Sequence, residues 1–258
     1  MLNSPKVNKI FSSEKMKRFL LWFAAISLLG TLAFLLKDVS PHADTKNVYE
    51  GAVLLNQGAA ETDSGNYEAA LVLFNKALPM LDNKNKFKVY YNIGRTYNEK
   101  REPGKALINL DKSIELNSFC TYCFGERGRA YSQLEKADKA IENYTKAIEL
   151  EPNNYIAYVN RAIEYSQINQ EDKSMIDLKH AIVLSSDNPA VYIDLITSLM
   201  YNKKYTEAQE YINQFKLIIK SDDSFNYEQY LLFQSKLYYN LDDYKNLIPF
   251  AQEAIDKY

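Results

Sequence analysis

The sequence predicts an all-α protein: a right-handed α-solenoid of about six helix-turn-helix repeats, preceded by one transmembrane helix. Three observations predict this architecture. Small residues recur with a period close to 34 residues, which is typical of stacked helical hairpins. The 258 residues include only 8 Gly and 7 Pro, too few for many short strands joined by tight turns. Residues 19–36 form an apolar run without a single charged residue.

The N-terminus combines a basic tail with this apolar run. Residues 1–18 carry five Lys and Arg residues against one acidic residue, Glu14. The run that follows, FLLWFAAISLLGTLAFLL, would be roughly 27 Å long as a helix, close to the bilayer hydrocarbon thickness of about 30 Å. Because positive flanks stay in the cytoplasm, we expect a single-pass membrane protein with a cytoplasmic N-terminus. The remaining chain would be extracytoplasmic, and periplasmic if the source is bacterial.

A cleaved signal peptide is the alternative interpretation of the same segment. Its apolar core would usually be about 7–15 residues long and would end near a small-x-small cleavage site. The run over 19–36 is longer, and the sequence KDVSPHADT after it offers no clean A-x-A. The uncleaved anchor is therefore favoured. Cleavage would instead give a soluble, secreted or periplasmic protein.

After a linker expected over 37–50, the chain repeats itself. The first four units are aligned on Gly58, Gly94, Gly128 and Ala162, each followed by small residues 12 and 19 positions later. A small residue lets two helices approach closely, so each unit is expected to be an antiparallel helix pair. Two weaker units follow, with Ile196 at the first small position of one and Leu247 at the second small position of the other. The six expected units lie near 51–86, 87–120, 121–154, 155–188, 189–222 and 228–258.

One unit identifies a family resemblance. Residues 127–154, RGRAYSQLEKADKAIENYTKAIELEPNN, resemble the tetratricopeptide repeat. The matching residues are Gly128, Tyr131, Ala140, Tyr144, Ala147 and Pro152, with Arg127 in the place of the family's Leu. The resemblance covers about residues 51–258 and implies a stack whose first helices line a concave groove. It also implies a scaffold that binds a peptide or helix of a partner protein, rather than an enzyme.

Groove positions in this register lie one, four and five residues after the first small residue of a unit, and two and three before it. Ten residues at or beside these positions are expected to contact a partner: Tyr91, Asn92, Arg95, Asn98, Tyr122, Glu126, Arg129, Gln133, Asn160 and Gln167. Asp194 and Lys236 hold such positions in the weaker units.

Two of these groove residues suggest a specific ligand. Arg95 and Arg129 occupy the same place in adjacent units and would lie about 10 Å apart, so they could clamp a carboxylate. The alternative is that they pair with Glu99 and Glu126 or are solvated.

Cys120 and Cys123 form a C-T-Y-C motif at the junction of two units. Three interpretations remain open. A helix N-terminus lowers a thiol pKa, which would suit a redox pair. An extracytoplasmic location would allow a short-loop disulfide. The third interpretation is two small, partly buried residues at a repeat joint. Phe124 stands where haem attachment would need His.

Other chemistry finds little support in the sequence. The net charge of −2 gives no basic face for nucleic acid. His42 and His180 lie far from any nucleophile motif, so we expect no catalytic residues, no metal site and no cofactor. The final unit contains Tyr227, Tyr230, Tyr238 and Tyr239, which suggests a homo-oligomer formed through the C-terminal repeat.

Overall fold

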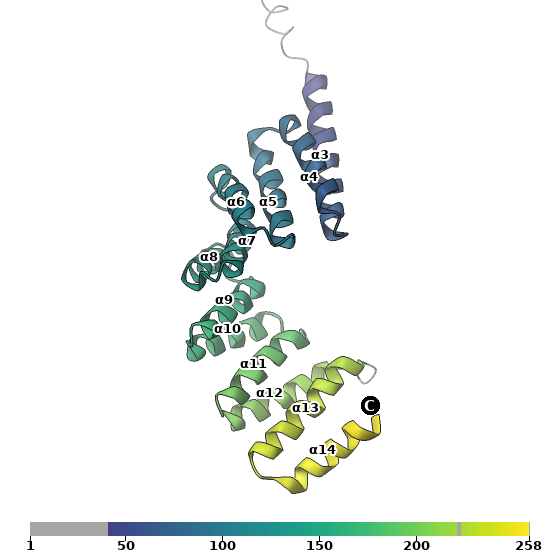
Figure 1. Cartoon of the computed structure of the whole chain (residues 1–258), viewed down its shortest axis with the longest axis vertical. Helices are drawn as coiled ribbons and strands as arrows, with labels where there is room; N and C mark the ends of the chain where they lie inside the picture. Colours follow the sequence, from purple (N-terminus) through teal and green to yellow (C-terminus); the bar gives the residue numbers. More distant parts are fainter. Residues whose placement is uncertain (1–40, 221–222, 258) are drawn as a thin grey trace, which may run out of the picture.

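The computed structural model describes residues 41–220 and 223–257, and every regular element in these ranges is helical (Figure 1). The helices are α3 (Pro41–Asp63), α4 (Tyr67–Ala77), η1 (Leu78–Met80), α5 (Asn83–Glu99), α6 (Pro103–Leu116), α7 (Thr121–Gln133), α8 (Ala137–Leu150), α9 (Tyr155–Gln167), α10 (Glu171–Leu184), α11 (Pro189–Tyr201), α12 (Tyr205–Ile218), α13 (Ser224–Asn240) and α14 (Tyr244–Lys257). Apart from the single 3-10 turn η1, they form six successive helix pairs. The all-α repeat architecture expected from the sequence is confirmed.

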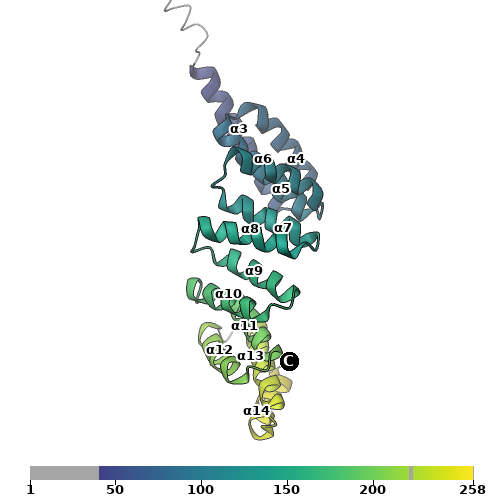
Figure 2. The ribbon, with the colours of Figure 1, turned by 90° about the vertical axis from the view of Figure 1, so that its left-hand side faces the viewer.

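The helix pairs stack in chain order, with α3 at one end of an elongated molecule and α14 at the other (Figures 1 and 2). Helices within a pair contact each other, and each pair contacts the next. Some first helices of adjacent pairs also contact each other: α5 contacts α7, and α11 contacts α13. This arrangement is a solenoid, in which a helix pair buries its apolar stripe only against its neighbours.

Three glycines permit close approach of the two helices within a pair. A Cβ atom placed on Gly58 would lie 2.5 Å from Phe74, and one on Gly94 would lie 2.6 Å from Leu110. Each opposing side chain stands sixteen residues after its glycine and is fully buried. The repeat of small residues in the sequence therefore marks where the two helices of each pair pack closely.

Each helix pair turns through one residue with a left-handed backbone. The φ angle is 79° at Gly65 and between 55° and 59° at Arg101, Glu135, Asn169, Lys203 and Asp242. All six stand seven residues after the first small position of their unit. The fifth unit keeps this turn although Ile196 replaces its small residue. Left-handed backbone disfavours side chains other than those of Asn and Asp, so the turns at Arg101, Glu135 and Lys203 are strained.

The apolar core is continuous only in the later units. One cluster of buried side chains extends from Ala162 on α9 to Leu237 on α13. The earlier units contain smaller separate clusters, such as the one formed by Ala106, Leu110 and Ala130. The longest continuous cluster of buried apolar side chains therefore joins α9 to α13.

The N-terminal boundary needs one correction. The linker expected over 37–50 is helical from Pro41, because α3 begins there and continues to Asp63. Pro is favoured in the first turn of a helix, where its missing N–H costs no hydrogen bond. The expected transmembrane helix over 19–36 and the basic tail over 1–18 lie outside the described residues. No helix in the described ranges is both long and apolar enough to cross a bilayer.

Candidate functional site

The groove positions of the second and third units carry an ion-pair network. Arg95 pairs with Asp63 of the preceding unit. Arg129 Nη1 lies 2.9 Å from Glu99 Oε1 and 3.6 Å from Glu126 Oε2. Both guanidinium groups are thus already bound to carboxylates within the chain. The pairing of Arg129 with Glu99 and Glu126 matches the alternative expected for it, whereas Arg95 uses Asp63, a partner that the sequence did not suggest.

Asn98 joins two helices from a buried position and does not face a partner. Its Nδ2 donates to the backbone oxygen of Glu126 at 2.9 Å and to Glu126 Oε2 at 2.7 Å. Gln133 Nε2 in turn donates to the Asn98 backbone oxygen at 3.0 Å. Burial raises the pKa of Glu126, and the hydrogen bond from Asn98 opposes that rise. These expected contact residues instead tie α5 to α7.

The remaining expected residues of these units are Tyr91, Asn92 and Tyr122. The rings of Tyr91 and Tyr122 meet edge to face, with centroids 4.6 Å apart. Tyr122 stays 45% exposed, while burial raises the pKa of Tyr91 to about 12. Asn92 Nδ2 donates to the Lys88 backbone oxygen at 2.8 Å. Of this group, Tyr122 presents the most surface to a partner.

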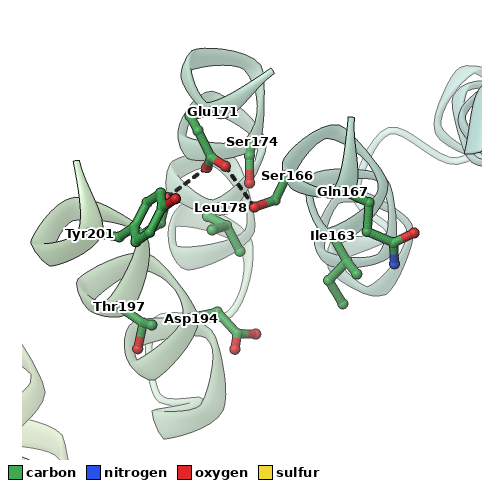
Figure 3. Close-up of a pocket in the computed structure, with 10 residues that line it drawn as sticks. Ile163, Ser166, Gln167, Glu171, Ser174, Leu178, Asp194, Thr197 and Tyr201 are labelled. Carbon is green, nitrogen blue, oxygen red and sulfur yellow. Dashed lines mark hydrogen bonds between the residues drawn. The ribbon is translucent and has the colours of Figure 1, made fainter. Parts of the chain in front are cut away.

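A cavity of about 490 Å³ opens between α9, α10 and α11, in the fourth and fifth units (Figure 3). Its lining residues are Ile163, Ser166, Gln167, Glu171, Ser174, Leu178, Asp194, Thr197, Ser198 and Tyr201. The cavity is named here the α9–α11 cavity.

Most residues that line this cavity from α9 and α11 stand at groove positions of the repeat register. Ile163, Ser166 and Gln167 lie one, four and five residues after Ala162. Asp194, Thr197 and Tyr201 hold groove positions around Ile196 in the same way. Gln167 and Asp194 were expected from the sequence, whereas Ile163, Ser166, Thr197 and Tyr201 were not, although the same register selects them. Asn160, by contrast, is partly buried on α9 and does not line the cavity.

The α9–α11 cavity combines an apolar part with an acidic edge. Leu178 is buried in it, and Ile163 and Tyr201 are exposed around it. Ser166 Oγ donates to Glu171 Oε1 at 2.9 Å, and Ser198 Oγ donates to Oε2 at 3.5 Å. These two bonds, drawn in Figure 3, hold the Glu171 carboxylate in place.

The second carboxylate of the cavity, Asp194, borders it from α11. Desolvation raises the pKa of Asp194, although its side chain remains accessible from the groove. No Lys or Arg lines the cavity. Its edge is therefore negative, without a compensating positive charge in the wall.

Cys120 and Cys123 form a disulfide at the N-terminus of α7. Both residues are buried, at 2% and 0% exposure, and Cys123 Sγ lies 3.1 Å from Ser113 Oγ. Disulfide exchange needs a thiolate to reach a sulfur atom, which this burial prevents in the folded protein. The arrangement agrees with the short-loop disulfide and disfavours an exchange-active redox pair.

The tyrosines of the final unit serve mainly in packing. Tyr230 is 3% exposed, Tyr238 stacks on Phe250, and the Tyr227 hydroxyl donates to Glu253 Oε1 at 2.6 Å. Tyr239 alone of the four is mostly exposed, at 62%. Three of these four tyrosines are thus used within the unit, and the homo-oligomer through the C-terminal repeat stays a prediction.

Comparisons with known proteins agree with this geometry. Family models described as tetratricopeptide repeat match residues 87–120, 122–154 and 143–175. No curated protein matches the sequence. Solved structures do match: Pseudomonas aeruginosa PilF has a TM-score of 0.67 at 16% identity, covering 83% of this chain and 94% of PilF.

Two further structures show the same likeness. PilW, described as a widely conserved type IV pilus biogenesis factor, has a TM-score of 0.64 at 15% identity and covers 80% of this chain and 93% of its own. A TPR protein of Thermus thermophilus has a TM-score of 0.56 at 20% identity, with coverages of 72% and 98%. At these identities the likeness shows the fold and does not identify a partner.

Proposed function

We propose, from the premise that this chain is a tetratricopeptide-repeat protein, that it is a membrane-anchored scaffold whose concave groove binds a peptide or helix of a partner protein. The α9–α11 cavity is the observation that carries the proposal. It lies at groove positions of two adjacent repeats, and it combines apolar side chains with polar groups that could orient a ligand, which is typical of a binding site. The groove of the second and third units is instead largely occupied by its own ion pairs.

The anchor is a separate part of this proposal. Its support is the sequence: a basic tail over 1–18 followed by an uncharged apolar run over 19–36. The scaffold would then have a cytoplasmic N-terminus and an extracytoplasmic repeat domain. The mass of the mature chain tests cleavage, since loss of the N-terminal residues would favour the secreted or periplasmic alternative. Protease added to spheroplasts, in which the cytoplasmic membrane is intact and the periplasm is open, should degrade the repeat domain and leave the tail intact.

Partner recovery tests the groove. Crosslinking and co-purification from detergent-solubilised membranes should recover a discrete protein with the wild type. The groove variant Gln167→Ala/Tyr201→Ala removes two exposed side chains of the cavity and should lose that protein.

A matched control exists on other helices of the same units. Val183→Ala/Leu217→Ala removes side chains that are 79% and 85% exposed on α10 and α12 and do not line the cavity. This control should recover the partner normally. Recovery by the groove variant together with loss by the control would place the contact on the second helices and contradict the proposal.

A further inference from the structure

The α9–α11 cavity differs in charge from the groove that precedes it. In the first three units Asp63, Glu99 and Glu126 are all paired with arginine. In the cavity, neither Glu171 nor Asp194 forms an ion pair with any residue in the described part of the chain. The groove thus contains two carboxylates that no Lys or Arg of the described residues neutralises.

The Glu171 carboxylate has no cationic partner, but hydrogen bonds hold it in a defined position. Serine hydroxyl groups from α9 and α11 donate to its two oxygens, so it is fixed between the first helices of adjacent units. Asp194 borders the same space from α11 (Figure 3). A charged hydrogen bond to a fixed carboxylate is stronger than one to a mobile surface carboxylate, because less side-chain entropy is lost.

The cavity also has an apolar part, and exposed apolar side chains follow on α13. Ile163 is 45% exposed and Tyr201 is 80% exposed beside the buried Leu178. On α13, which contacts α11, the groove positions around Ser235 include Leu232 and Tyr239, exposed at 52% and 62%. Exposed apolar side chains at groove positions therefore recur in three successive units. A row of apolar side chains over three units fits an extended peptide or helix better than a single small molecule.

Resting on the proposed function, we infer that the α9–α11 cavity receives a basic-apolar segment of a partner protein. One large aliphatic or aromatic side chain of that segment packs against Ile163, Leu178 and Tyr201. A Lys or Arg close to it in the segment binds the carboxylates of Glu171 and Asp194. The acidic edge rejects acidic segments, so charge supplies the selectivity and apolar contact supplies most of the affinity.

Selection from a random library tests this inference with a defined probe. Phage-displayed random 12-residue peptides are selected against the full chain in detergent micelles. Enriched peptides should contain a large apolar residue with Lys or Arg within about four positions, one helical turn. Binding of a labelled consensus peptide should weaken as salt increases, because exposed charges are screened.

Three variants test separately how charge, access to the cavity and an unrelated surface affect peptide binding. Glu171→Gln/Asp194→Asn keeps the shape of both side chains but removes both charges. It should weaken binding of the consensus peptide roughly tenfold or more. Thr197→Trp, at an exposed lining position, should block the cavity and abolish binding. Val183→Ala/Leu217→Ala should bind as the wild type does. Circular dichroism of each variant checks that the helices remain.

The outcomes distinguish this inference from the proposed function. Peptides blocked by Thr197→Trp but lacking basic residues, or unaffected by removal of the two charges, would overturn the basic-apolar inference and leave groove binding standing. Failure to enrich any peptide, or loss of binding only in the control variant, would overturn both. A peptide of residues 1–18 that displaces the consensus peptide at equal concentration would instead assign the cavity to this chain's own basic tail.

Discussion

Tyr144 fills the space that Gly128 leaves open: a Cβ atom on Gly128 would lie 2.7 Å from Tyr144 Cε1. Tyr144 is only 2% exposed, and burial raises the pKa of its hydroxyl. The two residues belong to α7 and α8, so this contact sets the distance between the two helices of the third pair.

Gly128→Ala should therefore destabilise the protein, by about 1–3 kcal/mol, because the tightly packed Tyr144 ring must shift. Gly125→Ala is a matched control on the same helix, since nothing lies within 4 Å of a Cβ atom there. It should instead stabilise by up to about 1 kcal/mol through helix propensity. Urea denaturation followed by circular dichroism measures both. Equal effects at the two positions would contradict the close-approach role of Gly128.

Arg161 and Asp177 form a buried bidentate pair, with Nε–Oδ2 at 2.7 Å and Nη2–Oδ1 at 2.8 Å. The Asp177 side chain is 5% exposed. Arg161→Met should cost about 3–5 kcal/mol, because it leaves a buried charge unpaired. Lys204→Met breaks the pair with Asp172, which is 89% exposed, and should cost less than about 1 kcal/mol. Thermal unfolding distinguishes them; a similar loss in both would show that burial of the pair is unimportant.

Glu164 is 2% exposed, and its Oε2 atom has no hydrogen-bond partner. Burial raises its pKa, opposed by a hydrogen bond from Ser132. The folded state therefore binds a proton more tightly than the unfolded state, and the charged carboxylate destabilises the fold at pH 7. Glu164→Gln should stabilise the protein by about 1–2 kcal/mol at pH 7. The gain should vanish as the pH falls below about 4, where the unfolded carboxyl is also protonated. A gain independent of pH would contradict the assigned cause.

Lys203 turns the fifth helix pair with a φ angle of 59°. Lys203→Gly should raise the free energy of unfolding by up to about 1 kcal/mol, because Gly adopts left-handed backbone without steric cost. Asn169, at 58° in the preceding unit, is the control. Asn tolerates this conformation, so Asn169→Gly should gain less. Chemical denaturation of both variants tests the difference, and an equal gain would point to a cause other than backbone strain.

The Cys120–Cys123 disulfide should stabilise the fold without taking part in exchange. Cys120→Ser/Cys123→Ser should lower stability by about 2 kcal/mol, the loop-closure value for so short a loop. The native protein should also leave insulin reduction unaccelerated in the presence of dithiothreitol, since both residues are buried. Acceleration that is lost in the Ser variant would restore the redox hypothesis.

The ion-pair partners of Arg95 and Arg129 could not be predicted in full from the sequence. Their equivalent positions predicted that Arg95 and Arg129 would share a groove wall. Their partners depend on which carboxylates come within reach after stacking, and Asp63 lies 32 residues before Arg95. The aligned small residues showed which helices are the first helices of their pairs. They did not show which groove side chains are exposed and which are buried. Asn98 was consequently expected in the groove, although it is buried between α5 and α7.

The sequence by itself determined the helix pairs, because Gly58, Gly94 and Gly128 mark where two helices must approach within a pair, and such local packing repeats with the chain. It also determined the register that selects Ile163, Thr197 and Tyr201. Only the tertiary structure decided that the groove is filled by ion pairs around Arg95 and Arg129 and open between α9 and α11. The physical reason is that pairing and cavity formation depend on contacts between units, which the periodicity of a single unit does not encode.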